Sequence, residues 1–268
     1  MKNKKIRELA VSGQFYPSCS DELNRYIEHF DNILKSNNIL LDNSIKGRAI
    51  IAPHAGYVYS GFTANLAYKY IPKDIKNIVV IGPSHKFGFD GASVALYDKY
   101  PTPLGNLTIN KELSKQLIDN YPFLNFKDEV HCEHSTEVQF PFIKHYKNDI
   151  KVVEIVYSSI DFHNISDVIY SLLLDENNFV VISTDLSHFY PLDKANQLDS
   201  ICLDAIINKD LKEFDNGCEA CGIIGVKAMI EVSNRLNYKV KVLDYRTSAD
   251  AIEDTNSVVG YTSVVLGI

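Results

Sequence analysis

Three histidines stand shortly after apolar runs that have the length of β-strands. His54 follows residues 48–53, His85 follows residues 77–84, and His188 follows residues 179–184. In an open α/β sheet the carboxyl ends of parallel strands share one edge, so side chains that are distant in sequence meet there. Imidazoles and carboxylates gathered at such an edge predict a metal site or an acid/base site.

His54 and His85 have similar neighbours. His54 lies in Pro53-His-Ala-Gly-Tyr57, and His85 closes Gly82-Pro-Ser-His85, so small residues leave each imidazole room to face a cavity. A single histidine of this kind is explained as well by hydrogen bonds that cap a turn. Two of them after consecutive predicted strands favour metal ligation.

Asp185 and His188 form an Asp-x-x-His pair beyond the third strand. An aspartate beside a histidine can fix its tautomer and raise its basicity, which suits a supported metal ligand or a general base. The alternative is that Asp185 caps a helix and His188 is a surface residue. The pair alone does not decide between the two, but its place beside the other histidines favours a functional role.

Residues 131–137 contain two histidines and two acids in seven positions. If a helix begins at His134, then His134 and Glu137 lie three apart on one face and both can point into a cleft. A charged helix start, with Glu137 favoured by the helix dipole, explains the same pattern. The role of His134 and Glu137 therefore stays open at this point.

The five cysteines are odd in number and irregularly spaced, which fits a reducing compartment better than a disulfide framework. Cys218-x-x-Cys221 lacks the second pair that a four-cysteine zinc site requires. Cys221 directly precedes a predicted helix, whose N-terminal amides would lower the pKa of its thiol and make it a better ligand and nucleophile. A small buried apolar residue is the alternative.

The elements that must position these residues alternate between strands and helices. The spacing of apolar residues predicts a first helix that Ser20 caps. Two short extended pieces broken by prolines predict an antiparallel excursion at residues 92–109. The pattern predicts an α/β fold, a single domain over residues 1–268 with a mixed, largely parallel sheet. The other predicted helices are 62–71, 165–174, 195–207 and 222–236, and the other predicted strands are 151–157, 239–245 and 259–266.

Composition excludes several classes of protein. The chain has 268 residues, 46% of them hydrophobic, which is ample for a sizeable core. Its formal charge of −7 argues against a broad surface for nucleic acid or an anionic membrane. The sequence has no continuous apolar segment that fits a signal peptide or a transmembrane helix, so we expect a cytoplasmic protein.

Six motifs occur in order along the chain: Gly13-Gln-Phe-Tyr-Pro17, Pro53-His-Ala-Gly-Tyr57 with Ser60-Gly61, Gly82-Pro-Ser-His85, Glu133-His-Ser-x-Glu137, Ser183-Thr-Asp-Leu-Ser-His188 and Cys221-Gly222 with Gly225. Together they resemble the Memo-like family, which includes protein B of the prokaryotic AmmeMemoRadiSam system. The resemblance spans nearly the whole chain and implies a fold similar to the class III extradiol ring-cleaving dioxygenases, with a mixed sheet between helical layers.

By this resemblance, His54, His85 and Cys221 match the metal ligands of the family, and Asp185 and His188 match residues that line the same pocket. The ring-cleaving dioxygenases hold iron with two histidines and a carboxylate, which a thiolate replaces here. A softer ligand makes copper or zinc more competitive and exposes the sulfur to oxidation. Ring cleavage is therefore not inferred from the fold.

The leading hypothesis is a metal-binding protein with a His/His/Cys site that is redox-active with iron or copper, in which Asp185 orients His188 as an acid or base. The alternatives are a zinc-dependent hydrolase and a non-enzymatic module that binds a peptide or protein in the same cleft. The expected ligand is a small molecule or a peptide. The resemblance also suggests a radical enzyme and an AMMECR1-like domain as partners. The sequence fixes neither the metal nor the substrate, and it does not establish catalysis.

Overall fold

A mixed β-sheet runs through the protein in the strand order β10-β11-β1-β8-β2-β7-β3-β6. The computed structural model describes residues 6–39, 41–42 and 44–268. The four central strands are mutually parallel: β1 (Gly47–Ala52), β8 (Asn178–Ser183), β2 (Asn77–Pro83) and β7 (Lys151–Tyr157). Antiparallel pairs extend the sheet on both sides through β10 (Lys239–Thr247), β11 (Val258–Gly267) and β3 (Ala92–Val94).

Short strands complete the pairing. The β3 strand pairs in parallel with β6 at one edge, and β9 pairs with β11 beside the loop that follows β8. These short strands are β4 (Lys99–Tyr100), β5 (Leu107–Ile109), β6 (Leu124–Asn125) and β9 (His188–Tyr190). The antiparallel excursion that the sequence predicted is therefore present, and the sheet is mixed.

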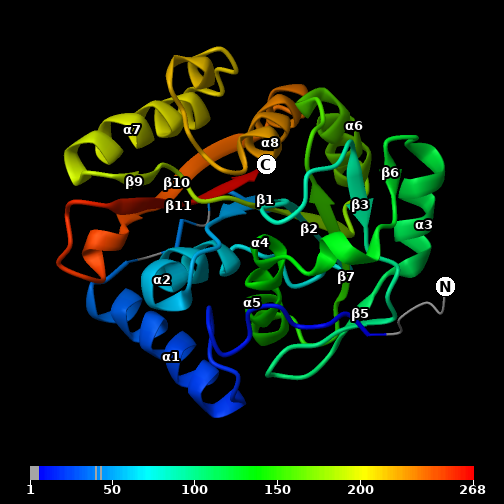
Figure 1. Ribbon diagram of the computed structural model, residues 1–268, viewed down its shortest axis with the longest axis horizontal. Coiled ribbons are helices and arrows are strands. Elements are labelled where there is room, and N and C mark those ends of the chain that lie inside the picture. Colours follow the sequence, from blue (N-terminus) through cyan, green and yellow to red (C-terminus); the bar gives the residue numbers. More distant parts are fainter. Residues whose placement is uncertain (1–5, 40, 43) are drawn as a thin grey trace.

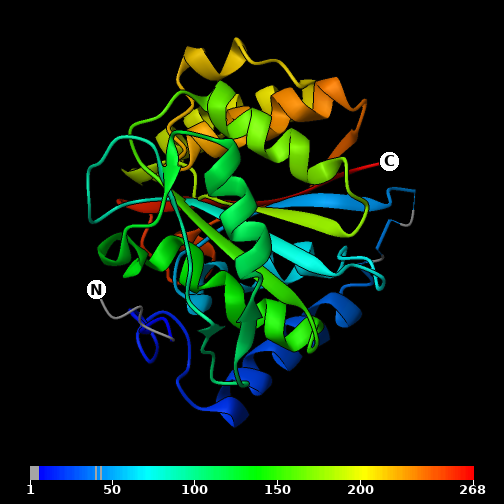
Figure 2. The same cartoon turned by 90° about the vertical axis from the view of Figure 1, so that its right-hand side faces the viewer.

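Helices cover both faces of the sheet (Figures 1 and 2). One face carries α1 (Ser20–Ser36), α2 (Tyr57–Tyr68) and α5 (Gln139–Tyr146). The opposite face carries α3 (Lys111–Asn120), α6 (Phe162–Leu173), α7 (Leu192–Asn208) and α8 (Ile223–Arg235). The short segments are α4 (His134–Glu137), η1 (Asp128–His131), η2 (Glu213–Asn216) and η3 (Ser248–Asp250). The predicted fold class is confirmed.

The two helical layers follow from the alternation of side chains along the strands. In β1, Ile50 and Ala52 join the core under α1, α2 and α5, whereas Ala49 and Ile51 join the core under α6 and α8. All four side chains are fully buried. A strand that is apolar on both faces needs a helical layer on each, which is why the central runs read as continuous apolar stretches.

Three details differ from the sequence prediction. The strands that end before His54 and His85 are β1 and β2. They are not direct neighbours in the sheet, because β8 lies between them. Cys19, not Ser20, is the N-cap of α1, and it makes no side-chain capping hydrogen bond. The α2 helix begins at Tyr57, earlier than the predicted start at Phe62, because Tyr57, Ser60 and Gly61 extend its buried face toward Gly56.

One pair of cysteines departs from the expectation of free thiols. Cys202 on α7 and Cys218 in the loop before α8 form a disulfide. Cys19, Cys132 and Cys221 are free. The Cys-x-x-Cys motif is therefore divided between a disulfide and a free thiol. Within the described ranges, the helices are all too short or too polar to cross a bilayer.

Candidate metal centre

The parallel strands bring three predicted site residues to one edge of the sheet. His54, His85 and Asp185 each stand two residues beyond the last residue of β1, β2 and β8. These three strands are neighbours in the order β1-β8-β2. The convergence that the sequence predicted from strand ends is present.

Three imidazoles form the centre of the site. His54, His85 and His134 each offer one ligand nitrogen, and these three atoms all lie within 4.8 Å of one another. The ring centroids are 5.2 Å apart for His54 and His85, 5.3 Å for His54 and His134, and 4.5 Å for His85 and His134. His134 is the first residue of α4, which contacts β2. The residue whose role the sequence left open therefore belongs to the cluster.

A hydroxyl group fixes the orientation of His54. Its Nδ1 lies 3.0 Å from Ser183 Oγ. The hydroxyl of Ser183 donates to the Ser135 carbonyl, and its oxygen accepts a hydrogen bond of 2.8 Å from Gln139 Nε2. Because the Ser183 proton is already used, His54 Nδ1 is the donor in their contact. The Nε2 lone pair of His54 is then free to bind a metal.

One buried carboxylate orients the other two imidazoles. Glu133 Oε1 lies 2.8 Å from His134 Nδ1 and 3.3 Å from His85 Nδ1. Glu133 also accepts hydrogen bonds from the backbone amides of His85 and His134, at 2.7 and 2.8 Å. Burial alone would raise the pKa of Glu133, but its hydrogen bonds to His134 and His85 outweigh burial and lower the pKa. An ionised Glu133 accepts from both Nδ1–H groups and leaves both Nε2 atoms for a metal.

Cys221 lies at the margin of this cluster. Its Sγ is 3.3 Å from His54 Nε2 and accepts a 3.3 Å hydrogen bond from the backbone amide of Asp185. A thiolate and an imidazole that share one metal ion stand roughly 3.5 Å apart, given bond lengths of about 2.3 and 2.0–2.1 Å. The position of Cys221 thus agrees with ligation beside His54.

Asp185 supports the turn that carries His54. Its Oδ1 accepts a 2.7 Å hydrogen bond from the backbone amide of His54, and its Oδ2 lies 4.0 Å from His54 Nε2. His188 is half-buried and begins β9, three residues after Asp185, where it pairs with Val259 of β11. Asp185 therefore lines the site through His54, and His188 stands on the strand that follows it.

Burial sets the protonation states at the centre. Burial lowers the pKa of His54 well below its ordinary value, and the neighbouring His85 and His134 lower it further, so His54 is neutral at pH 7. Burial raises the pKa of Asp185. Burial also raises the pKa of Cys221 to about 12, with Asp185 adding to the effect. The prediction of a lowered thiol pKa is wrong for the protein without a cation, because burial outweighs the helix amides; a coordinated metal would displace the proton.

Gly222, the residue after Cys221, allows the start of α8 to pack closely against the end of β8. The amide of Gly222 donates a 2.8 Å hydrogen bond to Thr184 Oγ1. A Cβ at Gly222 would lie 2.6 Å from Thr184 Cβ and 2.8 Å from the Ser183 carbonyl oxygen. The absence of a side chain lets the start of α8 approach the end of β8 closely, which brings Cys221 beside His54.

Glu137 does not face the cleft that the sequence analysis considered. It accepts hydrogen bonds from the amides of Ala10 and Val11, from the Tyr16 hydroxyl and from the Arg7 guanidinium. Glu137 therefore anchors the N-terminal segment, whereas His134, at the other end of the same turn, reaches the cluster.

The sequence reasoning missed the parts of the site that support the ligands. Glu133, Ser183 and Gln139 orient imidazoles or one another, and none of them was assigned a role. Glu133 and Ser183 do fall inside the motifs that carry the family resemblance, and that was the available signal.

Comparisons with known proteins identify the family of this chain. The family model described as Memo-like protein matches residues 7–265. A MEMO1 family protein of Aquifex aeolicus is 32% identical over 272 residues, which cover 97% of this chain and 99% of that protein. A MEMO1 family protein of Methanobrevibacter smithii is 34% identical, covering 96% of this chain and 98% of that protein. The chain belongs to the Memo-like family.

Proposed function

We propose that this protein binds a transition metal at the histidine cluster, with His54, His85 and Cys221 as ligands and His134 as a further donor. Iron or copper is the proposed metal, and redox chemistry is its proposed use. The observation that carries the proposal is that Ser183 and Glu133 occupy all three Nδ1 atoms. Three Nε2 lone pairs are left together in one cluster.

The donor set fits such an ion. Neutral imidazoles suit iron, copper and zinc, and a thiolate adds preference for the softer ions among them. His54 is held neutral by burial, so no proton has to be displaced from Nε2 before it binds. The hydrogen bonds from each Nδ1 to a fixed acceptor match the support that metal-bound histidines receive from their neighbours.

The neighbouring acids and bases define what this chain contributes besides ligands. Because burial raises the pKa of Asp185, this carboxyl takes up and returns a proton closer to neutral pH than an ordinary aspartate does. His188 begins β9, three residues after Asp185, and is half-buried, so it can exchange protons with solvent. Bound iron or copper would supply electron transfer at this site. Asp185 and His188 are the proposed proton carriers.

Elemental analysis tests the proposal. The protein would be purified without oxygen, chelator or metal-affinity resin and compared with the His54→Ala/His85→Ala variant. His163→Ala is the matched control, because His163 is an exposed histidine on α6 that pairs with Glu231. We expect near-stoichiometric iron or copper in the parent and in the control, and none in the double variant.

Two results would change the account. Equal metal content in the parent and the double variant would show that the cluster is not the site. Zinc in place of iron or copper, lost in the double variant, would retain the site but refute the redox assignment in favour of the hydrolase alternative.

A further inference from the structure

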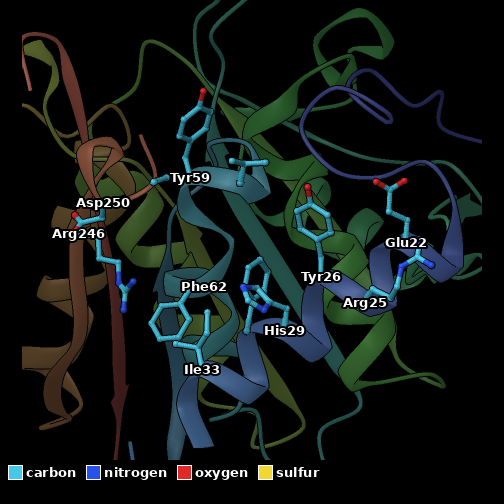
Figure 3. A pocket seen from close by; sticks show the side chains of 12 residues that line it. Glu22, Arg25, Tyr26, His29, Ile33, Tyr59, Phe62, Arg246 and Asp250 are labelled. Atoms are coloured by element: carbon cyan, nitrogen blue, oxygen red, sulfur yellow. The ribbon is translucent and has the colours of Figure 1, made fainter. Parts of the chain in front are cut away.

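A second candidate binding site lies between α1, α2 and the corner that joins β10 to η3. A cavity of about 580 Å³ occurs there (Figure 3). Small-molecule sites in proteins have volumes of roughly 300–1,000 Å³. None of the residues that line this cavity belongs to the histidine cluster. The metal centre therefore does not account for it.

An arginine is held in place at one end of the cavity. The guanidinium of Arg246 stacks on Phe62, with Cζ 3.9 Å from the ring centroid. Its Nε donates a 3.0 Å hydrogen bond to Asp244 Oδ2, which also accepts 2.7 Å from Thr63 Oγ1. Within residues 6–39, 41–42 and 44–268, neither Nη atom of Arg246 has a hydrogen-bond partner. A stacked, anchored guanidinium with free Nη groups is prepared to bind a carboxylate or phosphate by two parallel hydrogen bonds.

The charged side chains that line the cavity balance, two acids against two arginines, so recognition of an anion depends on which donors are unused. Asp250 is the acid at that end, and its Oδ2 already accepts from the amide and hydroxyl of Thr247 at 2.8 and 3.4 Å. Glu22, the other acid, lies with Arg25 at the opposite end (Figure 3). Arg25 stands three residues after Glu22 on α1, which places the two charges on neighbouring positions of the helix surface. Arg246 is thus an anchored positive charge whose Nη groups are unused within the described part of the chain.

The middle of the cavity is aromatic. Tyr26 and Phe30 from α1 and Phe62 from α2 line it, together with Ile33 and Val58. Tyr26 and Phe30 meet edge to face, with ring centroids 6.2 Å apart. Such a lining takes up a flat apolar ring, which gains from burial and from contact with the ring faces.

We propose that this cavity binds a small planar aromatic anion, whose carboxylate or phosphate pairs with Arg246 and whose ring packs against Tyr26, Phe30 and Phe62. The site is separate from the metal centre. Its recognition combines one bidentate charge contact with an aromatic floor, so both the charge and the ring are required.

Binding of three probes of similar shape tests the ligand class. They are 2-naphthoate, 2-naphthylmethanol and 2-naphthylmethylamine, measured by isothermal titration calorimetry with the full chain. We expect 2-naphthoate to bind at least about tenfold more tightly than the neutral and cationic probes, which is the usual weight of a charge-assisted hydrogen bond. Equal binding of the three probes would refute the recognition of an anion.

Variants locate the binding. Arg246→Gln should weaken 2-naphthoate by about tenfold or more, and Arg246→Lys should restore only part of the affinity because lysine lacks the planar fork. Arg235→Gln is the matched control, since Arg235 also stacks on an aromatic ring, with Cζ 3.8 Å from the Tyr170 centroid, and pairs with Asp167 outside the cavity. The control should bind 2-naphthoate like the parent.

The metal centre must be excluded as the place where the carboxylate binds. The His54→Ala/His85→Ala variant should therefore bind 2-naphthoate with unchanged affinity. Loss of binding in that variant, or full binding in Arg246→Gln, would overturn the proposal. If Arg246→Gln does not fold, Phe62→Leu provides the second test, because it retains the charge and removes the stacking face, and unchanged binding in it would equally contradict the proposal.

Discussion

At the scale of single residues, Glu133 determines how two of the three imidazoles are presented. It is fully buried and contacts the Nδ1 atoms of both His85 and His134. One carboxylate thus sets two tautomers and two ring orientations. Ser183 does the same for His54 with a neutral hydroxyl. The site depends as much on these acceptors as on the ligands.

Glu133→Gln should therefore weaken metal binding while the fold is retained. The amide oxygen can still accept from the backbone, but it cannot hold both imidazoles as an ionised carboxylate does. We expect a loss of about 10- to 100-fold in the affinity for Co²⁺, measured by competition with a chelator. Glu231→Gln, which removes the carboxylate charge beside the exposed His163, is the control. Equal affinities of the two variants would show that Glu133 does not support the ligands.

Cys221→Ser tests the fourth donor separately from the histidines. If Cys221 is a ligand, the Co²⁺-loaded parent should show a thiolate-to-metal absorption band in the near ultraviolet, and the variant should lack it. Cys132→Ser is the control, because Cys132 is also free but exposed. A band that persists in Cys221→Ser would leave His54, His85 and His134 as the ligands and Cys221 as a packing residue.

Some residues of the site could be predicted from the sequence because they follow strand ends directly. His54, His85 and Asp185 are of this kind. Glu133 and His134 come after η1 and do not directly follow a strand, so periodicity gives no indication of where they point. Cys221 was raised above a packing residue only by the family resemblance.

At the scale of secondary-structure elements, the approach of α8 to β8 positions Cys221. The helix begins directly after Gly222, and its fit depends on that residue having no side chain. The disulfide between Cys202 and Cys218 also attaches the preceding loop to α7. The elements on both sides of Cys221 are thus held close to the sheet edge.

Gly222→Ala should destabilise the protein and disturb the site. A Cβ there would meet the Ser183 carbonyl oxygen at 2.8 Å, and backbone cannot move aside cheaply. We expect the free energy of unfolding to fall by about 1–3 kcal/mol, measured by urea denaturation. Gly88→Ala is the matched control, because a Cβ at Gly88 meets no atom within 4 Å. If both variants unfold at the same urea concentration as the parent, the packing argument fails.

The central strands and most helices were predictable because fully buried strands read as apolar runs and helices show a recurring apolar face. Strand order was not predictable to the same degree. The insertion of β8 between β1 and β2 depends on packing between segments more than a hundred residues apart. The short β9 strand pairs with β11 through residues 68 and 71 positions apart, and its residues carry no strand pattern of their own.

At the scale of the whole molecule, a buried ionic network fastens the N-terminal segment to the sheet. Arg7 pairs with Glu137 of α4 and lies 3.7 Å from Glu154 of β7, and all three side chains are buried. Glu154 also accepts hydrogen bonds from Thr136, at 2.6 Å, and lies 2.9 Å from His131. Since this network lowers the pKa of Glu154, acid should weaken the fold.

The direction of the pH dependence of stability follows from the pKa of Glu154. Burial alone would raise its pKa, but His131 and Arg7 outweigh burial and lower the pKa from the ordinary value of 4.5. Its contribution to stability is therefore fully present above about pH 4.5 and is lost as the pH falls through the lower, folded-state pKa. We expect the free energy of unfolding of the parent to decrease with acid in that window.

The matched comparison is between two glutamate variants. Glu154→Gln should be less stable than the parent at pH 7 and should show a shallower loss of stability below pH 4.5, because the linked proton uptake is gone. Glu253→Gln, at an exposed position, should follow the parent. The free energy of unfolding would be measured by urea denaturation at each pH. The same loss of stability below pH 4.5 in the parent and in Glu154→Gln would contradict the role of Glu154.

The central claim is that a metal ion binds where the three imidazoles meet. The most direct test is anomalous diffraction from a crystal of the anaerobically purified protein, collected at the iron, copper and zinc absorption edges. We expect one peak at about 2.0–2.4 Å from the Nε2 atoms of His54 and His85 and from Cys221 Sγ. A metal-loaded crystal whose anomalous peak lies elsewhere, with these side chains unligated, would contradict the account.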